Sequence, residues 1–233
     1  MRKFLSIVFL VIAALTWPDL RVQATSIQAY QDYQFQFDQY RQRLADYQIA
    51  ITQYKQFNSL ASQQDALDKV KLLIAQRSTA GKAYALFLNE KLTENPGIPA
   101  NELSIYRTIL TNQVGFLDKG IQLAPSIASL DDAARVSEQF VNNYEAMQSA
   151  YRQTIAAVEL GYLNYFAKRF DDVAVKAQAL INESRSDATP QKQAVLDRWL
   201  LTLSNKHILY QQKANSISSM IPKINGDVMQ QDR

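Results

Sequence analysis

Residues 30–54 read YQDYQFQFDQYRQRLADYQIAITQY and carry the clearest helical pattern in the chain. Their aromatic and aliphatic residues follow one another at spacings of 3, 4, 3, 4, 3, 4 and 3. An unbroken spacing of this kind is typical of a helix that supercoils left-handedly around a partner helix. Most of these residues are tyrosines, which suit a wide, partly wet groove better than a tight two-stranded contact. The predicted packing seam of this helix, the tyrosine seam, consists of Tyr30, Tyr33, Phe37, Tyr40, Leu44, Tyr47, Ile51 and Tyr54.

Beyond Tyr54 the pattern loses its phase and resumes out of register at residues 67–74. Between the two segments lie Asn58, Ser59 and Ser62, whose short polar side chains compete for backbone hydrogen bonds and favour turns and helix caps. We therefore expect a turn at this point. The alternative is one continuous helical rod, because neither Gly nor Pro enforces the turn.

Pro96, Gly97 and Pro99, then Pro125, and then Pro190 mark three junctions, at residues 95–99, at 125 and at 186–190. Between the junctions apolar residues recur at helical spacing, and no sustained alternation of period two indicates a strand. The sequence therefore predicts an all-α fold, an elongated antiparallel bundle or set of coiled-coil hairpins of about five helices. The predicted helices span about 27–57, 63–93, 100–122, 130–184 and 190–220.

The segment 130–184 has a different rhythm, with apolar spacings of 4, 4 and 3 repeated along it. This eleven-residue repeat keeps the apolar stripe on one face of a nearly straight helix, which would be about 80 Å long if unbroken. Ser129 and Asp132 resemble a capping box at its start. Gly161 is the one weak point, and it indicates a kink or a close crossing. The packing residues predicted for this helix and the last one are Phe140, Tyr144, Tyr151, Tyr162, Phe166 and Trp199.

The amino terminus has the pattern of an export signal. Arg2 and Lys3 precede an apolar run of about 14 residues, shorter than the roughly 20 that a membrane-spanning helix needs. We predict cleavage after Ala24, with an uncleaved membrane anchor as the alternative. The predicted organisation is a signal peptide at 1–24, a single helical-bundle domain at 25–224 and a loose polar tail at 225–233. Export makes the predicted location extracytoplasmic: periplasmic, cell-surface or secreted.

Composition excludes several classes of function. The 233 residues include no Cys and one His, which removes disulfides, zinc–cysteine sites, thiol nucleophiles and multi-His metal sites. Loss of residues 1–24 would lower the formal net charge from +3 to +1. No run of Lys or Arg remains to follow a phosphate backbone, so nucleic acid is not an expected partner. Membrane contact is expected only through an uncleaved signal segment.

No residue set indicates catalysis. The single histidine, His207, has no carboxylate nearby in sequence, and its expected role is a hydrogen bond at a helix interface, with a general base or metal ligand as the alternative. Glu90 and Glu94, one turn apart, are expected on a solvated helix face, although such a pair can hold a cation weakly. The sequence contains no phosphate loop, nucleophile elbow or zinc-protease motif. We predict no catalytic, cofactor-binding or metal-binding residues.

The leading functional hypothesis is a non-enzymatic helical scaffold or adaptor that binds protein partners, or itself, through helix–helix contacts. Two alternatives remain open: a holdase-type chaperone with exposed apolar arms, and a ligand-binding helical bundle of the sensory type. The tyrosine seam is expected to be packing surface, with sugar or peptide binding as its alternative. Phe35, Ile49 and Phe57 lie off this seam and indicate a second contact surface for another helix, a second subunit or a client.

Overall fold

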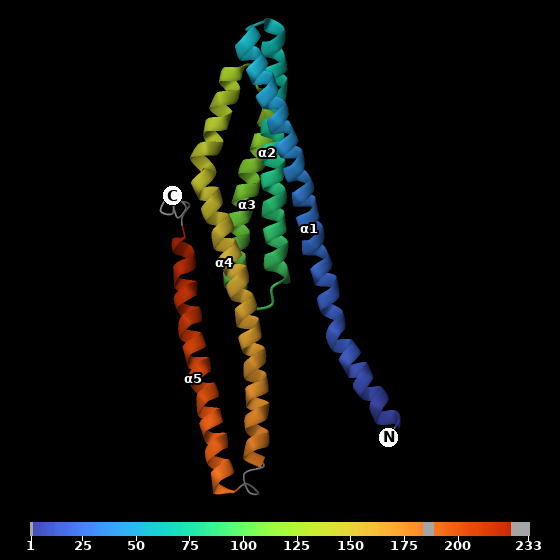
Figure 1. Cartoon of the computed structure of the whole chain (residues 1–233), viewed down its shortest axis with the longest axis vertical. Coiled ribbons are helices and arrows are strands. Elements are labelled where there is room, and N and C mark those ends of the chain that lie inside the picture. Colours follow the sequence, from blue (N-terminus) through green and yellow to red (C-terminus); the bar gives the residue numbers. More distant parts are fainter. Residues whose placement is uncertain (1, 184–188, 225–233) are drawn as a thin grey trace.

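The computed structural model describes the backbone of residues 2–183 and 189–224, and the side chains from residue 25 onward within those ranges. In these ranges five α-helices pack antiparallel into an elongated bundle, and no strand occurs, so the predicted all-α fold is confirmed (Figure 1). The tail predicted to be loose, residues 225–233, lies outside the described residues. The helices are α1 (Arg2–Phe57), α2 (Leu60–Glu94), α3 (Ala100–Leu123), α4 (Leu130–Glu183) and α5 (Pro190–Met220), with short 3-10 helices η1 (Ala124–Ser126) and η3 (Ile221–Lys223).

α1 runs without a break from Arg2, so its backbone joins the predicted signal segment to the predicted first helix. The side chains of residues 1–24 lie outside the described residues. Figure 1 shows this first part of α1 in dark blue, running past the end of α2 and away from the other helices. None of the helices, over the residues that the structure describes, is both long and apolar enough to cross a membrane.

The predicted turn between the first two helices is confirmed. Asn58 has a φ of 45°, a left-handed conformation that Asn tolerates better than most residues, and it ends α1. Ser59 and Ser62 then form a reciprocal capping box, in which each backbone N–H donates to the other's hydroxyl oxygen at 3.2 Å. Because the chain reverses here, α1 and α2 form an antiparallel hairpin.

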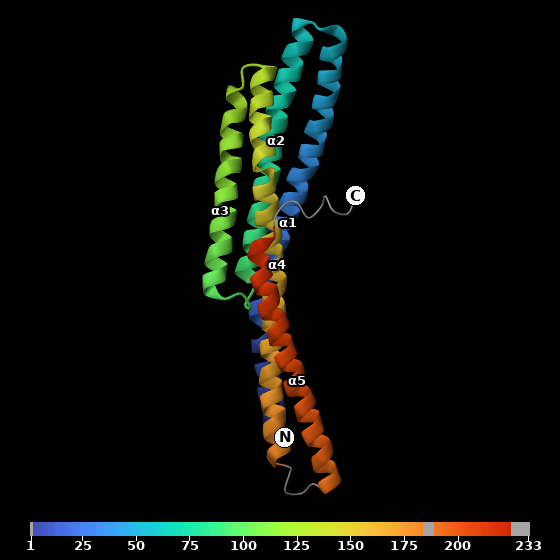
Figure 2. The ribbon, with the colours of Figure 1, turned by 90° about the vertical axis from the view of Figure 1, so that its left-hand side faces the viewer.

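α2 lies at the centre of the bundle, with α1, α3 and α4 around it (Figure 2). It contributes to two buried apolar clusters, one towards each of its ends. The first includes Leu88 and Leu92 of α2, and the second includes Val70 and Ile74. Both clusters are completed by α3 and α4, because the ridges of three helices must interlock to exclude water from this centre.

The loop that joins α2 to α3 is fixed against α4. Asn95 ends α2 and is only 5% exposed. Its Nδ2 donates to the Val158 carbonyl oxygen of α4 at 2.6 Å, and its Oδ1 accepts the Gly97 N–H at 3.0 Å. Both polar ends of a buried amide are therefore satisfied, and the loop is held in one position on the long helix.

α4 is one continuous helix from Leu130 to Glu183, and it is bent, so the nearly straight course predicted from the eleven-residue repeat is wrong (Figure 1). Its start matches the predicted cap in part: the Asp132 N–H donates to Ser129 Oγ at 3.1 Å. Up to Gly161 the helix contributes to the packed centre. Beyond that point it extends past the ends of α2 and α3 with only α5 beside it, as the two views show (Figures 1 and 2). The bundle is thus thick at one end and a two-helix hairpin at the other.

Candidate functional site

The part of the molecule with the least internal burial is this hairpin, residues 162–183 of α4 together with α5. None of its described residues falls in the buried class, whereas the first half of α4 buries eight. Two helices alone cannot cover each other on more than one face, so apolar side chains on the remaining faces stay in contact with water. The hairpin therefore presents exposed apolar side chains from both of its helices, and it is the candidate site.

One face of the hairpin is closed by polar contacts between the two helices. His207 Nδ1 lies 2.7 Å from Asp171 Oδ1, and the Tyr210 hydroxyl donates to Asn164 Oδ1 at 2.9 Å. Desolvation, followed by the nearby Asp171 charge, raises the pKa of Tyr210. These pairs fix the register of α5 on α4. The carboxylate partner of His207 comes from a helix 36 residues earlier, where no local sequence signal points to it.

A groove of about 570 Å³ lies along this interface and includes Asp171 and His207 in its lining. Ser204, one turn before His207, also lines it. No hydrogen bond joins the described Ser204 and His207 side chains, so the nucleophile–base contact that acyl transfer needs is not formed. No cluster of three or more potential metal ligands was found over the described residues. The Asp171–His207 pair links α4 to α5.

The exposed faces of the hairpin carry large apolar side chains from both helices. On α4, Phe166, Phe170, Val173 and Leu180 are between 45% and 63% exposed. Their spacings of 4, 3 and 7 place them on one side of the helix, and we call these four residues the outer seam. On α5, Val195, Trp199, Leu201, Ile208 and Leu209 are exposed as well.

The tyrosine seam lies between α1 and α2 and is only half-buried. Tyr33 packs on Tyr84 of α2 with ring centroids 4.8 Å apart, and Tyr84 meets Tyr151 of α4 edge-on at 5.0 Å. Tyr30 lies 5.3 Å from Phe87. The aromatic contacts thus run from α1 through α2 to α4, and the rings retain partial access to water. The seam residues are Tyr30 and Phe37, which are exposed, and Tyr33, Tyr40, Leu44, Tyr47, Ile51 and Tyr54, which are intermediate.

The other predicted packing residues lie in different surroundings. Phe140 is buried in the second apolar cluster, and Tyr151 and Tyr162 pack against the first. Tyr144, Phe166 and Trp199 lie on exposed faces. Only part of the apolar stripe predicted for α4 therefore lies on the buried face of the helix. The helix buries a row of small residues instead: Ala150, Thr154, Ala157 and Gly161.

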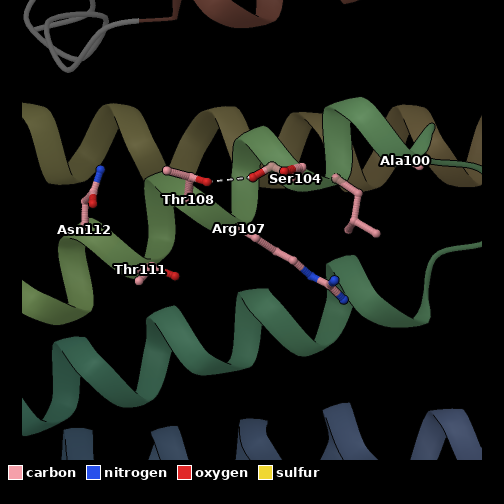
Figure 3. A pocket seen from close by; sticks show the side chains of 7 residues that line it. Ala100, Ser104, Arg107, Thr108, Thr111 and Asn112 are labelled. Carbon is pink, nitrogen blue, oxygen red and sulfur yellow. Dashed lines mark hydrogen bonds between the residues drawn. The ribbon is translucent and has the colours of Figure 1, made fainter.

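A separate hollow of about 440 Å³ lies on the outer side of α3 (Figure 3). Thr108 Oγ1 donates to the Ser104 carbonyl oxygen of the same helix at 2.9 Å. The Arg107 side chain extends toward α2, where its Nη2 donates to Thr93 Oγ1 at 2.9 Å. These polar groups already have partners within the protein, so they do not converge on an empty position where a ligand would sit.

Comparisons with protein-family models, with curated proteins and with solved structures found no match to this chain. The case for a function therefore rests on the residues and their geometry.

Proposed function

We propose that this protein is an exported, non-catalytic helical adaptor that binds a protein partner through the outer seam of α4. The observation that carries the proposal is the exposure of Phe166, Phe170, Val173 and Leu180, a row in which only Phe170 also lines the groove between α4 and α5. Exposed apolar surface is unfavourable in water, and contiguous patches of it on soluble proteins mark interaction sites.

The spacing of the outer seam favours a helix as its occupant. Phe166, Phe170 and Val173 follow at 4 and 3 residues, Ala177 continues the row, and Leu180 ends it three residues later. Apolar residues at this spacing remain in contact with a second helix that crosses at a shallow angle. An extended peptide has a different repeat and would lose contact with the row after a few residues. The proposed partner segment is an amphipathic helix that lays its apolar face on the seam.

The amino-terminal sequence supports an extracytoplasmic location for this interaction. A basic pair, a short apolar run and small residues before Thr25 together favour export and removal of residues 1–24. The partner would then be an envelope or secreted protein.

A matched pair of variants tests the seam. Phe166→Ser combined with Val173→Ser removes two of its apolar side chains, and Val141→Ser removes a similarly exposed one from the first half of the same helix. All three side chains are exposed, so we expect little change in the free energy of unfolding. Partner affinity should fall at least about tenfold in the double variant and stay unchanged in Val141→Ser.

A photo-crosslinking residue at position 173, with position 141 as control, identifies the partner in the native envelope. One protein recovered in stoichiometric amount from position 173 alone supports the adaptor. Many unfolded exported proteins would favour the chaperone alternative, and recovery of a second copy of this chain would mean self-association. Equal crosslinking from both positions, or none from position 173, would reject the seam as a docking surface.

A further inference from the structure

The end of α2 meets α1 at the position where the sequence predicts the mature chain to begin. The Ser26 backbone N–H donates to Oε1 of Glu94 at 2.8 Å, across 68 residues of sequence. Ser26 is 1% exposed, and one turn later the Tyr30 ring packs on Phe87 of α2. The predicted cleavage after Ala24 lies two residues before this bond. Among the residues whose side chains the structure describes, the contact of α1 with α2 therefore begins within two residues of the proposed cleavage site.

Glu94 is in an electrostatically unfavourable place in the full chain. It is the last residue of α2, where the unpaired carbonyl groups and the helix dipole disfavour negative charge. Desolvation and then the charges of Glu94 and of Glu159 of α4 raise the pKa of Tyr162, so both carboxylates act on this tyrosine. No cationic side chain among the described residues lies within ion-pair distance of Glu94. A half-buried carboxylate is thus held with a main-chain N–H as its partner.

Cleavage after Ala24 would supply the cationic partner that the Glu94 carboxylate lacks. In an intact α-helix the Ser26 N–H donates to the carbonyl of Val22, and that acceptor leaves with the signal segment. Glu94 remains as an acceptor for the same N–H. The new amino group of Thr25 is an ammonium ion one residue away from the bonded N–H, at the end of a helix whose first N–H groups have lost their partners.

We infer that Glu94 is a receptor for the amino terminus created by processing: its carboxylate caps the mature α1 helix at Ser26 and pairs with the α-ammonium of Thr25. This inference rests on the proposed removal of residues 1–24. Peptide hydrolysis between Ala24 and Thr25 consumes one water, releasing a carboxylate on Ala24 and the amine on Thr25. Processing would then complete the α1–α2 contact, and the Glu94 carboxylate, which has only a main-chain N–H as its partner in the full chain, would gain an ion pair.

The sign of the pH effect follows from the pair. An α-amine has an ordinary pKa of about 7.7–8.0, and a neighbouring carboxylate raises this pKa in the folded state. While the Glu94 carboxylate is charged, the pair's contribution to stability is therefore fully present below about pH 7.7 and is lost as the pH rises through the raised pKa of the amine.

The first step of the test is to express the full chain with its own leader in a bacterial secretion host and to read the amino terminus by mass spectrometry. Thr25 is the expected first residue. A chain that keeps residues 1–24 overturns this inference together with the proposed removal of the leader, whereas a cut at another bond overturns this inference alone; both leave the outer seam to its own test.

The second step measures the pKa of the Thr25 amine in the mature protein from the pH dependence of its 13Cα chemical shift. We expect a pKa above the ordinary value in the native protein and an ordinary value in urea, a comparison that needs no variant. Glu94→Gln should return the native value to the ordinary range, and Glu90→Gln, one turn earlier on α2, should leave it raised. Equal amine pKa values in the native and the urea-unfolded protein would overturn the role of Glu94 even where cleavage after Ala24 is found.

A third readout separates the ion pair from general packing. Glu94→Gln should raise the unfolding equilibrium constant about threefold more when the Thr25 amine is free than when it is acetylated. The same effect in both forms would mean that Glu94 acts on packing alone.

Discussion

A Cβ atom built on Gly97 would lie 1.8 Å from the carbonyl oxygen of Gly161. The loop between α2 and α3 therefore lies directly on the backbone of α4, at the last point where α4 belongs to the packed centre. Gly161 is equally constrained, because a Cβ there would meet Ile98 Cγ1 at 2.4 Å and Asn95 Oδ1 at 2.7 Å. The sequence indicates a kink or a close crossing at Gly161, and the structure contains the close crossing.

This contact predicts a strong effect of Gly97→Ala. The added methyl group collides with a main-chain atom, which cannot rotate away as a side chain can, so we expect a loss of about 3 kcal/mol in the free energy of unfolding. Gly115→Ala is the matched control, since nothing lies within 4 Å of its Cβ position inside α3. That change should stabilise the protein by about 0.5–1 kcal/mol through helix propensity. Urea unfolding of both variants measures the difference, and equal effects would contradict the close crossing.

Asn95→Ala should also be destabilising. The substitution leaves the Gly97 N–H without its 3.0 Å acceptor and removes the donor to the Val158 carbonyl oxygen, for a cost of about 1–3 kcal/mol. Asn101→Ala, at an exposed position of α3, should change stability by less than about 0.5 kcal/mol. Thermal unfolding of the pair provides the test. A loss for Asn95→Ala no larger than that for Asn101→Ala would mean that the loop is not held by this amide.

The aromatic contacts between α1, α2 and α4 predict that stability falls at alkaline pH. Desolvation raises the pKa of Tyr151 strongly, and it raises the pKa of Tyr33 and Tyr84 as well. The pKa values of these tyrosines in the folded state lie above the unfolded value of 10.0. Their contribution to the free energy of unfolding is therefore present below about pH 10, and it is lost as the pH rises through the folded-state pKa values.

Tyr151→Phe tests this dependence. The variant should be less stable at neutral pH by about 1 kcal/mol, because it loses the 3.1 Å hydrogen bond from the hydroxyl to the Gly81 carbonyl oxygen. It should also lose less stability than the wild type between about pH 9 and 11. Tyr144→Phe, at an exposed position of the same helix, is the control. Melting temperatures across this range check both effects, and parallel curves for wild type and Tyr151→Phe would be the contrary result.

The contact between Asp171 and His207 predicts a local effect. Asp171→Asn or His207→Ala should loosen the α4–α5 hairpin by about 1 kcal/mol or less, because both side chains are partly exposed and screened by water. Hydrogen exchange should become faster in residues 165–183 and 190–214 and stay unchanged in α2 and α3. Asp172→Asn, at the exposed neighbouring position, should alter neither region. Faster exchange throughout the bundle would show that the hairpin is not a separate unit of stability.

The helices and most of their boundaries could be predicted from the amino-acid sequence. Apolar spacing, the Ser59 and Ser62 pair, and Pro190 at the first position of α5 are local signals, and the structure has helices and a turn where they predict them. Such signals are readable because helix formation depends on hydrogen bonds and caps within a few residues of each other.

Which helix faces are buried, and which side chains meet, depends on the packing of the helices and could not be predicted from local sequence. α4 buries Ala150, Thr154, Ala157 and Gly161, small residues that hydropathy does not single out, because only small side chains allow neighbouring backbone to approach closely. His207 meets Asp171, and Ser26 meets Glu94, across 36 and 68 residues. Contacts at that separation depend on how whole helices pack, which no local pattern encodes.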